Sequence, residues 1–87
     1  MPDDSPLEFP CDIPVKVFGR NEAAFRQAVE AIVSSHYGEP GAIDVVERSS
    51  RHNKYLSLTV TVRAESREQI DALYVELSSH DAILMVL

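Results

Sequence analysis

Residues 54–64 constrain the fold of this chain more than any other stretch, because apolar and polar side chains alternate there without a break. The apolar residues are Leu56, Leu58, Val60 and Val62, and the polar ones between them are Ser57, Thr59, Thr61 and Arg63. A period of two over eight residues, rich in β-branched side chains, is typical of a strand with one buried face. The sequence therefore predicts a sheet with a core on one side and hydroxyl groups on the other.

Three further stretches are predicted to be strands. Residues 11–19 alternate in the same way. Residues 43–50 carry charged side chains, which discourage pairing with other strands, and therefore fit an edge strand. The closing residues 82–87 are apolar on both faces. The chain should therefore contain four strands, of which the second is an edge strand.

Two stretches have the period of an amphipathic helix. The first is predicted to begin at Glu22, with Asn21 as its cap, and to end at Gly38. Its apolar stripe consists of Phe25, Ala28, Val29, Ile32 and Val33. Ser66 and Gln69 form a capping box that predicts a second helix. The core face of this second helix consists of Ile70, Leu73, Tyr74 and Leu77.

The order of these elements is strand, helix, strand, strand, helix, strand. Two helices that each bury one stripe must cover the same face of a four-stranded sheet, and right-handed crossovers then give the split βαβ arrangement. We therefore predict an α+β ferredoxin-like βαββαβ fold, with an antiparallel sheet in the order 4-1-3-2, as a single domain over residues 11–87. Residues 1–10 hold three prolines and three acidic residues and are predicted to form a flexible N-terminal segment.

One face of such a sheet would remain uncovered by helices. If Ile83, Met85 and Leu87 belong to the core, then Leu84 and Val86 point outward beside Phe18. The sequence therefore predicts an apolar patch of Phe18, Leu84 and Val86 that binds a protein partner or a second copy of the chain.

The loop before residue 55 is basic within an acidic protein. Arg48, Arg51, His52 and Lys54 cluster there, although the net charge of the chain is −6. We expect Arg48 and Arg51 to meet an acidic protein surface or no partner at all, and not nucleic acid, because the overall field repels phosphate. The sequence also lacks the stacked aromatic residues of RNA-binding sheets on its central strands.

Several short motifs resemble those of one family. They are Leu7-Glu8-Phe9-Pro10, Lys16-Val17-Phe18-Gly19, Ser49-Ser50 before Tyr55, Leu73-Tyr74 followed by Glu76-Leu77, and the closing Met85-Val86-Leu87. From about residue 6 to its end the chain resembles the YbeD-like family of small uncharacterised bacterial proteins. This resemblance implies a ferredoxin-like fold that is similar to the ACT regulatory domains, which bind amino acids and control enzymes. It brings no catalytic residue with it.

The turn Gly19-Arg20-Asn21 lies where ACT-like domains often bind their ligand. Amides at the start of a helix, together with Arg20, could hold a carboxylate there. The competing interpretation is that Gly19 only makes a turn and that Asn21 only caps the helix. A sensor of amino acids or organic acids is therefore the alternative function.

The remaining residue types argue against catalysis, metal binding and membrane insertion. The three histidines show no ligand spacing, and Cys11 is the only cysteine, so we expect no metal, no cofactor and no disulfide. No signal-like segment opens the chain and no apolar run reaches about 18 residues, which favours the cytoplasm and excludes a membrane role. The sequence therefore predicts a non-catalytic regulatory or adaptor domain that acts through protein–protein contacts.

Overall fold

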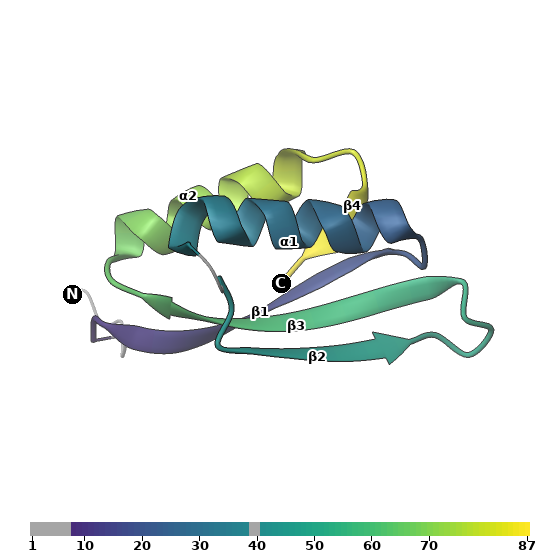
Figure 1. The fold of residues 1–87 in the computed structure, drawn as a ribbon, viewed down its shortest axis with the longest axis horizontal. Coiled ribbons are helices and arrows are strands. Elements are labelled where there is room, and N and C mark those ends of the chain that lie inside the picture. The colour runs from purple at the N-terminus through teal and green to yellow at the C-terminus, as the bar shows by residue number, and fades with distance from the viewer. Residues whose placement is uncertain (1–7, 39–40) are drawn as a thin grey trace.

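The computed structural model describes residues 8–38 and 41–87. Its elements are β1 (Cys11–Arg20), α1 (Ala23–Tyr37), β2 (Asp44–Ser49), β3 (Tyr55–Ala64), α2 (Arg67–Ser79) and β4 (Ile83–Val86). The antiparallel sheet has the order β2-β3-β1-β4, and both helices lie on one of its faces (Figure 1). The predicted ferredoxin-like fold and strand order are confirmed.

The core lies between β1, β3 and the two helices. The register of β1 and β3 places Val15 opposite Val60 and Val17 opposite Leu58, and all four side chains are buried. The alternation in β3 is confirmed, since its four predicted core residues are at most 5% exposed. Burial of each such side chain contributes on the order of 1.5–3 kcal/mol, so these two strands hold the domain together.

The N-terminal segment that was predicted to be flexible comprises residues 1–10. The described residues begin at residue 8, so this prediction lies largely outside the described part of the chain. Within the described part, Phe9 is half-buried and packs against the core. The segment is therefore attached to the domain at least at this residue.

The two helices begin in different ways. At α2, the Ser66 hydroxyl accepts a hydrogen bond from the Gln69 N–H at 3.2 Å, while the Gln69 side chain accepts one from the Glu65 N–H at 2.7 Å. The capping motif is therefore present, although its second bond goes to the residue before Ser66. At α1 the prediction was wrong: the N-cap is Glu22, which makes no capping bond with its side chain. Asn21 instead reaches sideways to the hairpin between β2 and β3.

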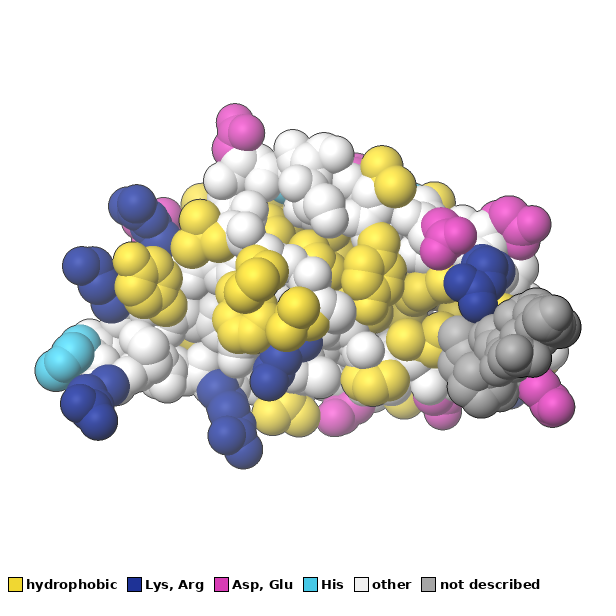
Figure 2. All heavy atoms as spheres, turned by 180° about the vertical axis from the view of Figure 1, so that it is seen from behind, with side chains coloured by type: hydrophobic (Ala, Val, Ile, Leu, Met, Phe, Trp, Pro, Cys, Tyr) yellow, Lys and Arg dark blue, Asp and Glu magenta, His cyan; other side chains and the backbone are white. Residues whose placement is uncertain are grey.

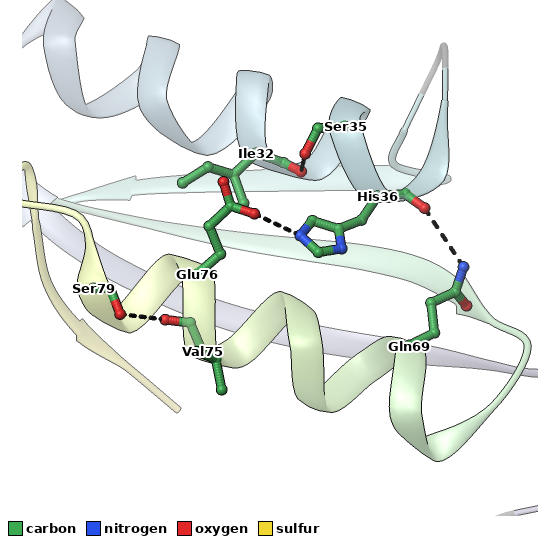
Figure 3. A network of polar contacts seen from close by, with 7 residues as sticks. All are labelled: Ile32, Ser35, His36, Gln69, Val75, Glu76 and Ser79. Atoms are coloured by element: carbon green, nitrogen blue, oxygen red, sulfur yellow. Dashed lines mark hydrogen bonds and ion pairs between the residues drawn. The ribbon is translucent and has the colours of Figure 1, made fainter.

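The predicted end of α1 is correct. Gly38 has a positive φ of 82°, a conformation that glycine adopts at little cost, and its N–H bonds to the Ser34 carbonyl at 2.8 Å. Near this end, His36 Nε2 lies 2.7 Å from Glu76 Oε1 of α2, and the Gln69 side chain reaches the His36 carbonyl (Figure 3). These contacts fix the spacing of the two helices.

The register of β4 corrects the predicted faces of the C-terminal residues. Ile83 lies opposite Gly19, but Met85 lies opposite Phe18 and Val86 opposite Val17, so the register shifts by one residue. Val86 consequently packs against the core, and Met85 joins Phe18 on the face away from the helices. The prediction had Val86 outside and Met85 inside, because it assumed an unbroken alternation, which a bulge interrupts.

Leu87 is also on the opposite face from the predicted one. Its N–H and carbonyl bond to the carbonyl and N–H of Lys16 at 2.8 and 3.2 Å, so the two residues are directly opposed. Because Lys16 points away from the helices, Leu87 does too, and its side chain is 62% exposed.

Candidate functional site

The strongest candidate site is the sheet surface opposite the helices, which we call the open face. Its central rows come from alternate residues of β1 and β3, in which Lys16 lies opposite Thr59 and Phe18 opposite Ser57. Beside them, β4 contributes Met85 and the following residue is Leu87. We call Phe18, Met85 and Leu87 the apolar patch.

The apolar patch is exposed to different degrees. Met85 is 50% and Leu87 62% exposed, whereas Phe18 is half-buried. Seen from behind the view of Figure 1, apolar side chains gather in the middle of the molecule (Figure 2). The predicted residue Leu84 is exposed as well, at 57%, and it lies at the β4 bulge beside the patch. The structure therefore supports an apolar surface here, with Met85 and Leu87 in place of Val86.

Polar groups around the patch are partly engaged within the molecule. Lys16 Nζ lies 5.8 Å from the centre of the Phe18 ring, a cation–π distance. Arg63 bonds to Asp12 at 3.1 Å across β1 and β3. Both contacts engage charged side chains of the open face within the molecule.

Positive charge gathers at one end of this face. Arg20 ends β1 opposite Tyr55, Arg48 lies opposite Ser57 on the open face, and Arg51 belongs to the hairpin that follows β2. With Lys16 and Lys54, these are five of the eight lysines and arginines of the chain. Figure 2 shows this cationic end and, toward the opposite end and along the top, more of the acidic side chains.

The turn Gly19-Arg20-Asn21 meets the same hairpin. The Asn21 N–H donates to the Lys54 carbonyl and the Asn21 side-chain amide to the Asn53 carbonyl, both at 3.0 Å. An open pocket of about 400 Å³ lies between the turn and the hairpin, lined by Arg20, Asn21, Glu22, Asn53, Lys54 and Tyr55. The sequence pointed to the turn but not to the hairpin, because nothing in a linear pattern indicates that they touch.

Gly19 has a steric role in the structure. A Cβ atom at this position would lie 2.2 Å from Cδ1 of Phe25, whose ring is buried in the core. The glycine therefore makes room for that ring. Arg20, the charged residue of the turn, forms no ion pair with any described residue, and it lines the pocket.

A second pocket, which the sequence analysis did not anticipate, lies between α1 and β2. It measures about 420 Å³, and its apolar walls come from Val29, Val33, Val45, Leu58 and Val60. Arg26 and Glu47 close one end with two hydrogen bonds of 3.2 and 2.9 Å. This bonding raises the pKa of Arg26 and lowers the pKa of Glu47 from their ordinary values. The pocket exists because α1 leaves the inner side of β2 uncovered.

The other candidate chemistry gains no support. Within residues 8–38 and 41–87, no three His, Cys, Asp or Glu side chains converge as a metal site would require. Cys11 is a free, half-buried thiol at the start of β1. Neither described helix has the length and apolar character needed to cross a bilayer.

Comparison with known proteins gives similarity over the whole chain. Residues 4–87 match the family described as "Protein of unknown function (DUF493)". A UPF0250 protein of Nitrosomonas europaea is 40% identical over 87 residues, which is all of both chains. A UPF0250 protein of Hahella chejuensis is 42% identical over 93% of this chain and 89% of its own length.

Two solved structures share the fold. Protein HP0495 from H. pylori superposes with a TM-score of 0.63 at 16% identity, over 100% of this chain and 94% of its own. An uncharacterized protein from Thermotoga maritima, TM1266, gives 0.64 at 10% identity, over 87% of this chain and 92% of its own. These likenesses concern the fold alone. The sequence relatives carry the assignment: as the resemblance to YbeD-like proteins predicted, the chain belongs to the DUF493 family.

Proposed function

We propose that the protein is a non-catalytic regulatory or adaptor module that binds a protein partner through the open face. The observation that carries this proposal is the apolar patch. Two of its side chains, Met85 and Leu87, are at least half exposed on a surface whose central strand otherwise presents hydroxyl groups. An apolar cluster of this kind, surrounded by polar groups, is typical of an interaction surface.

The charges beside the patch define the partner further. Arg48 and Lys16 are on the open face itself, and Arg20 lies at its end next to the hairpin. A partner that covers Met85 and Leu87 would therefore meet positive charge toward the hairpin. We expect its contact surface to combine an apolar centre with acidic residues on one side, since complementary charge fixes orientation and speeds encounter. The cytoplasm, predicted from the sequence, is the compartment in which we place this contact.

Site-specific photocrosslinking in living cells tests the proposal. A benzophenone amino acid at Ser57, in the centre of the open face, should capture one discrete partner. The same amino acid at Asp71, exposed on α2, should not. Met85→Lys should abolish capture from Ser57, because a charge would enter the centre of the contact.

The matched control for this variant is Val75→Lys. Val75 is an apolar residue on α2 with 66% exposure, comparable with that of Met85, but it lies on the helical side. Capture should persist in this variant. Equal capture from Asp71 and Ser57, or equal loss in both lysine variants, would exclude the open face as the binding surface.

A second candidate function follows from the pocket between the turn and the hairpin. Arg20 and Lys54 line it together with Glu22, so its charged groups are two cations and one carboxylate, and the excess of positive charge favours a carboxylate ligand such as an amino acid or an organic acid. A panel of such compounds should include one that raises the melting temperature of the wild type. The shift should vanish in Arg20→Ala and remain in Arg48→Ala, which lies outside the pocket. A panel without any shift would exclude this function for the compounds tested.

A further inference from the structure

The outer edge of β2 is one of the two edges of the described sheet. Within residues 8–38 and 41–87, β2 has a neighbouring strand on one side only, and all six of its residues are exposed. Three large apolar side chains follow one another closely here: Ile43 is 56%, Val45 53% and Val46 48% exposed. An exposed apolar edge strand is a template for pairing with another strand.

The hydrogen bonds to β3 identify which residues of β2 are available for such pairing. The Ser50 N–H donates to the Tyr55 carbonyl at 2.9 Å, and the register makes these two residues directly opposite. Because bonding alternates along an antiparallel pair, Asp44, Val46 and Arg48 also turn their main-chain groups toward β3. Val45, Glu47 and Ser49 therefore direct their N–H and carbonyl groups to the outside.

This alternation restricts how two copies of β2 can pair. Two copies of β2 can form main-chain hydrogen bonds only if residues whose N–H and carbonyl groups point outward lie opposite each other. In a symmetric antiparallel pair, this condition is met when the two-fold axis passes through a residue, and not when it passes between two residues. An axis at Glu47 opposes two carboxylates that are already paired with Arg26, and it leaves Arg48 opposite Val46. An axis at Val45 opposes Asp44 to Val46. An axis at Val46 places Asp44 of each copy opposite Arg48 of the other, so the dimer contains two such pairs.

The charges of the edge therefore select one register. Asp44 and Arg48 point to the same face as Val46 and form no ion pair with any described residue of their own chain. We propose that two copies of this chain pair along β2, with the axis at Val46, to form one continuous eight-stranded sheet. In this dimer Val45 bonds to Glu47 of the second copy through the main chain, and the two Val46 side chains meet.

The proposed dimer also places the α1–β2 pocket next to the interface between the two copies. Val45 lines this pocket and Glu47 closes its end in the ion pair with Arg26. Pairing at β2 brings the pockets of the two copies together above the shared strands, while both apolar patches stay free on the open face. The inference thus goes beyond the proposed function and does not depend on it.

A charge-exchange experiment tests the register. Sedimentation velocity at about 100 µM and low salt should show a wild-type dimer. Asp44→Arg and Arg48→Asp should each weaken association about tenfold, because either change turns two attractive cross-strand pairs into repulsive ones. A mixture of these two variants should form a heterodimer, since arginines at positions 44 and 48 then face aspartates.

Two controls carry the same charge changes away from the edge. Asp71→Arg on α2 and Arg51→Asp in the hairpin should leave the dimer intact. Circular dichroism confirms that each variant is folded. If the wild type is a monomer, or if the mixture associates no better than its components, the proposed pairing is wrong.

A disulfide test measures the same register independently. The two Val46 residues form a non-hydrogen-bonded pair with Cα atoms about 4.5 Å apart, within disulfide reach. In a Cys11→Ser background, Val46→Cys should oxidise rapidly to a covalent dimer. Ser49→Cys should not, because the two copies of residue 49 would be about 20 Å apart. Equal crosslinking at both positions would contradict the axis at Val46, and a dimer sensitive to Met85→Lys but to neither edge charge would place the interface on the open face.

Discussion

Replacing Gly19 by alanine tests whether this glycine serves packing or ligand binding. Its backbone does not have the positive φ that excludes other residues, so space alone opposes the substitution. A Cβ atom would lie 2.2 Å from Cδ1 and 2.6 Å from Cγ of Phe25, a side chain that is 1% exposed. The ring can yield only by disturbing the core. We expect the free energy of unfolding to fall by about 1–3 kcal/mol, the usual cost of overpacking.

Denaturant unfolding followed by circular dichroism measures this loss, and each kcal/mol should lower the melting temperature by roughly 4–8 °C. The second step is a double-mutant cycle with Phe25→Leu, whose smaller side chain leaves room for the added methyl group. In that background Gly19→Ala should cost much less than in the wild type.

Gly38→Ala is the matched control. No atom of the described residues lies within 4 Å of its added Cβ atom, but its φ of 82° at a ψ of −162° should cost an alanine about 1–3 kcal/mol. This loss should be the same with Phe25 and with leucine at that position. The packing argument is refuted if Gly19→Ala changes stability by less than about 0.5 kcal/mol, or if its cost does not depend on Phe25.

Three further expectations follow from the fold. Val60→Asp should unfold the domain, whereas Thr59→Asp should remain folded, because only Val60 faces the core and a buried, unpaired carboxylate costs several kcal/mol; similar melting temperatures would contradict the assigned faces. Ser66→Ala should destabilise by about 1 kcal/mol through loss of its bond to the Gln69 N–H, and Ser66→Asp should retain the stability. Tyr37→Phe should be neutral or stabilising, since the hydroxyl is buried without a hydrogen-bond partner among the described residues. Burial also raises the pKa of Tyr37 in the folded state. The stability that depends on the protonated hydroxyl is therefore fully present below the unfolded-state pKa near 10 and is lost as the pH rises through the folded-state pKa. Alkaline unfolding of Tyr37→Phe should begin at higher pH than in the wild type.

The sequence was sufficient where a periodic pattern coincides with full burial. The alternation in β3 predicted its buried face correctly. A shift of one residue exchanges the two faces of a strand and would place the hydroxyl groups of Thr59 and Thr61 in the core, so the pattern allows only one orientation. The stripe on α1 was equally informative, as all five of its apolar residues are buried. Given four strands and two one-sided helices, the topology followed from packing and chirality alone.

The sequence was insufficient where contacts between distant segments decide the structure. Residues 82–87 are apolar throughout, so no alternation could reveal the bulge that turns Met85 and Leu87 outward and Val86 inward. Asn21 looked like a helix cap because the hairpin that engages it comes some thirty residues later. The α1–β2 pocket was missed for a related reason: its walls come from three elements, and its presence depends on how far α1 lies from the sheet edge.

A residue-by-residue map of contacts in native cell extract shows whether the open face binds a partner. Uniformly ¹⁵N-labelled protein is added to the extract, and the loss of each amide signal is compared with that in buffer. If the open face is the binding surface, signals should be lost selectively around Phe18, Ser57 and Met85, and the signals of Asp71 and Val75 on α2 should be retained. Loss centred on α2, or no selective loss at all, would contradict the proposal that this protein acts through its open face.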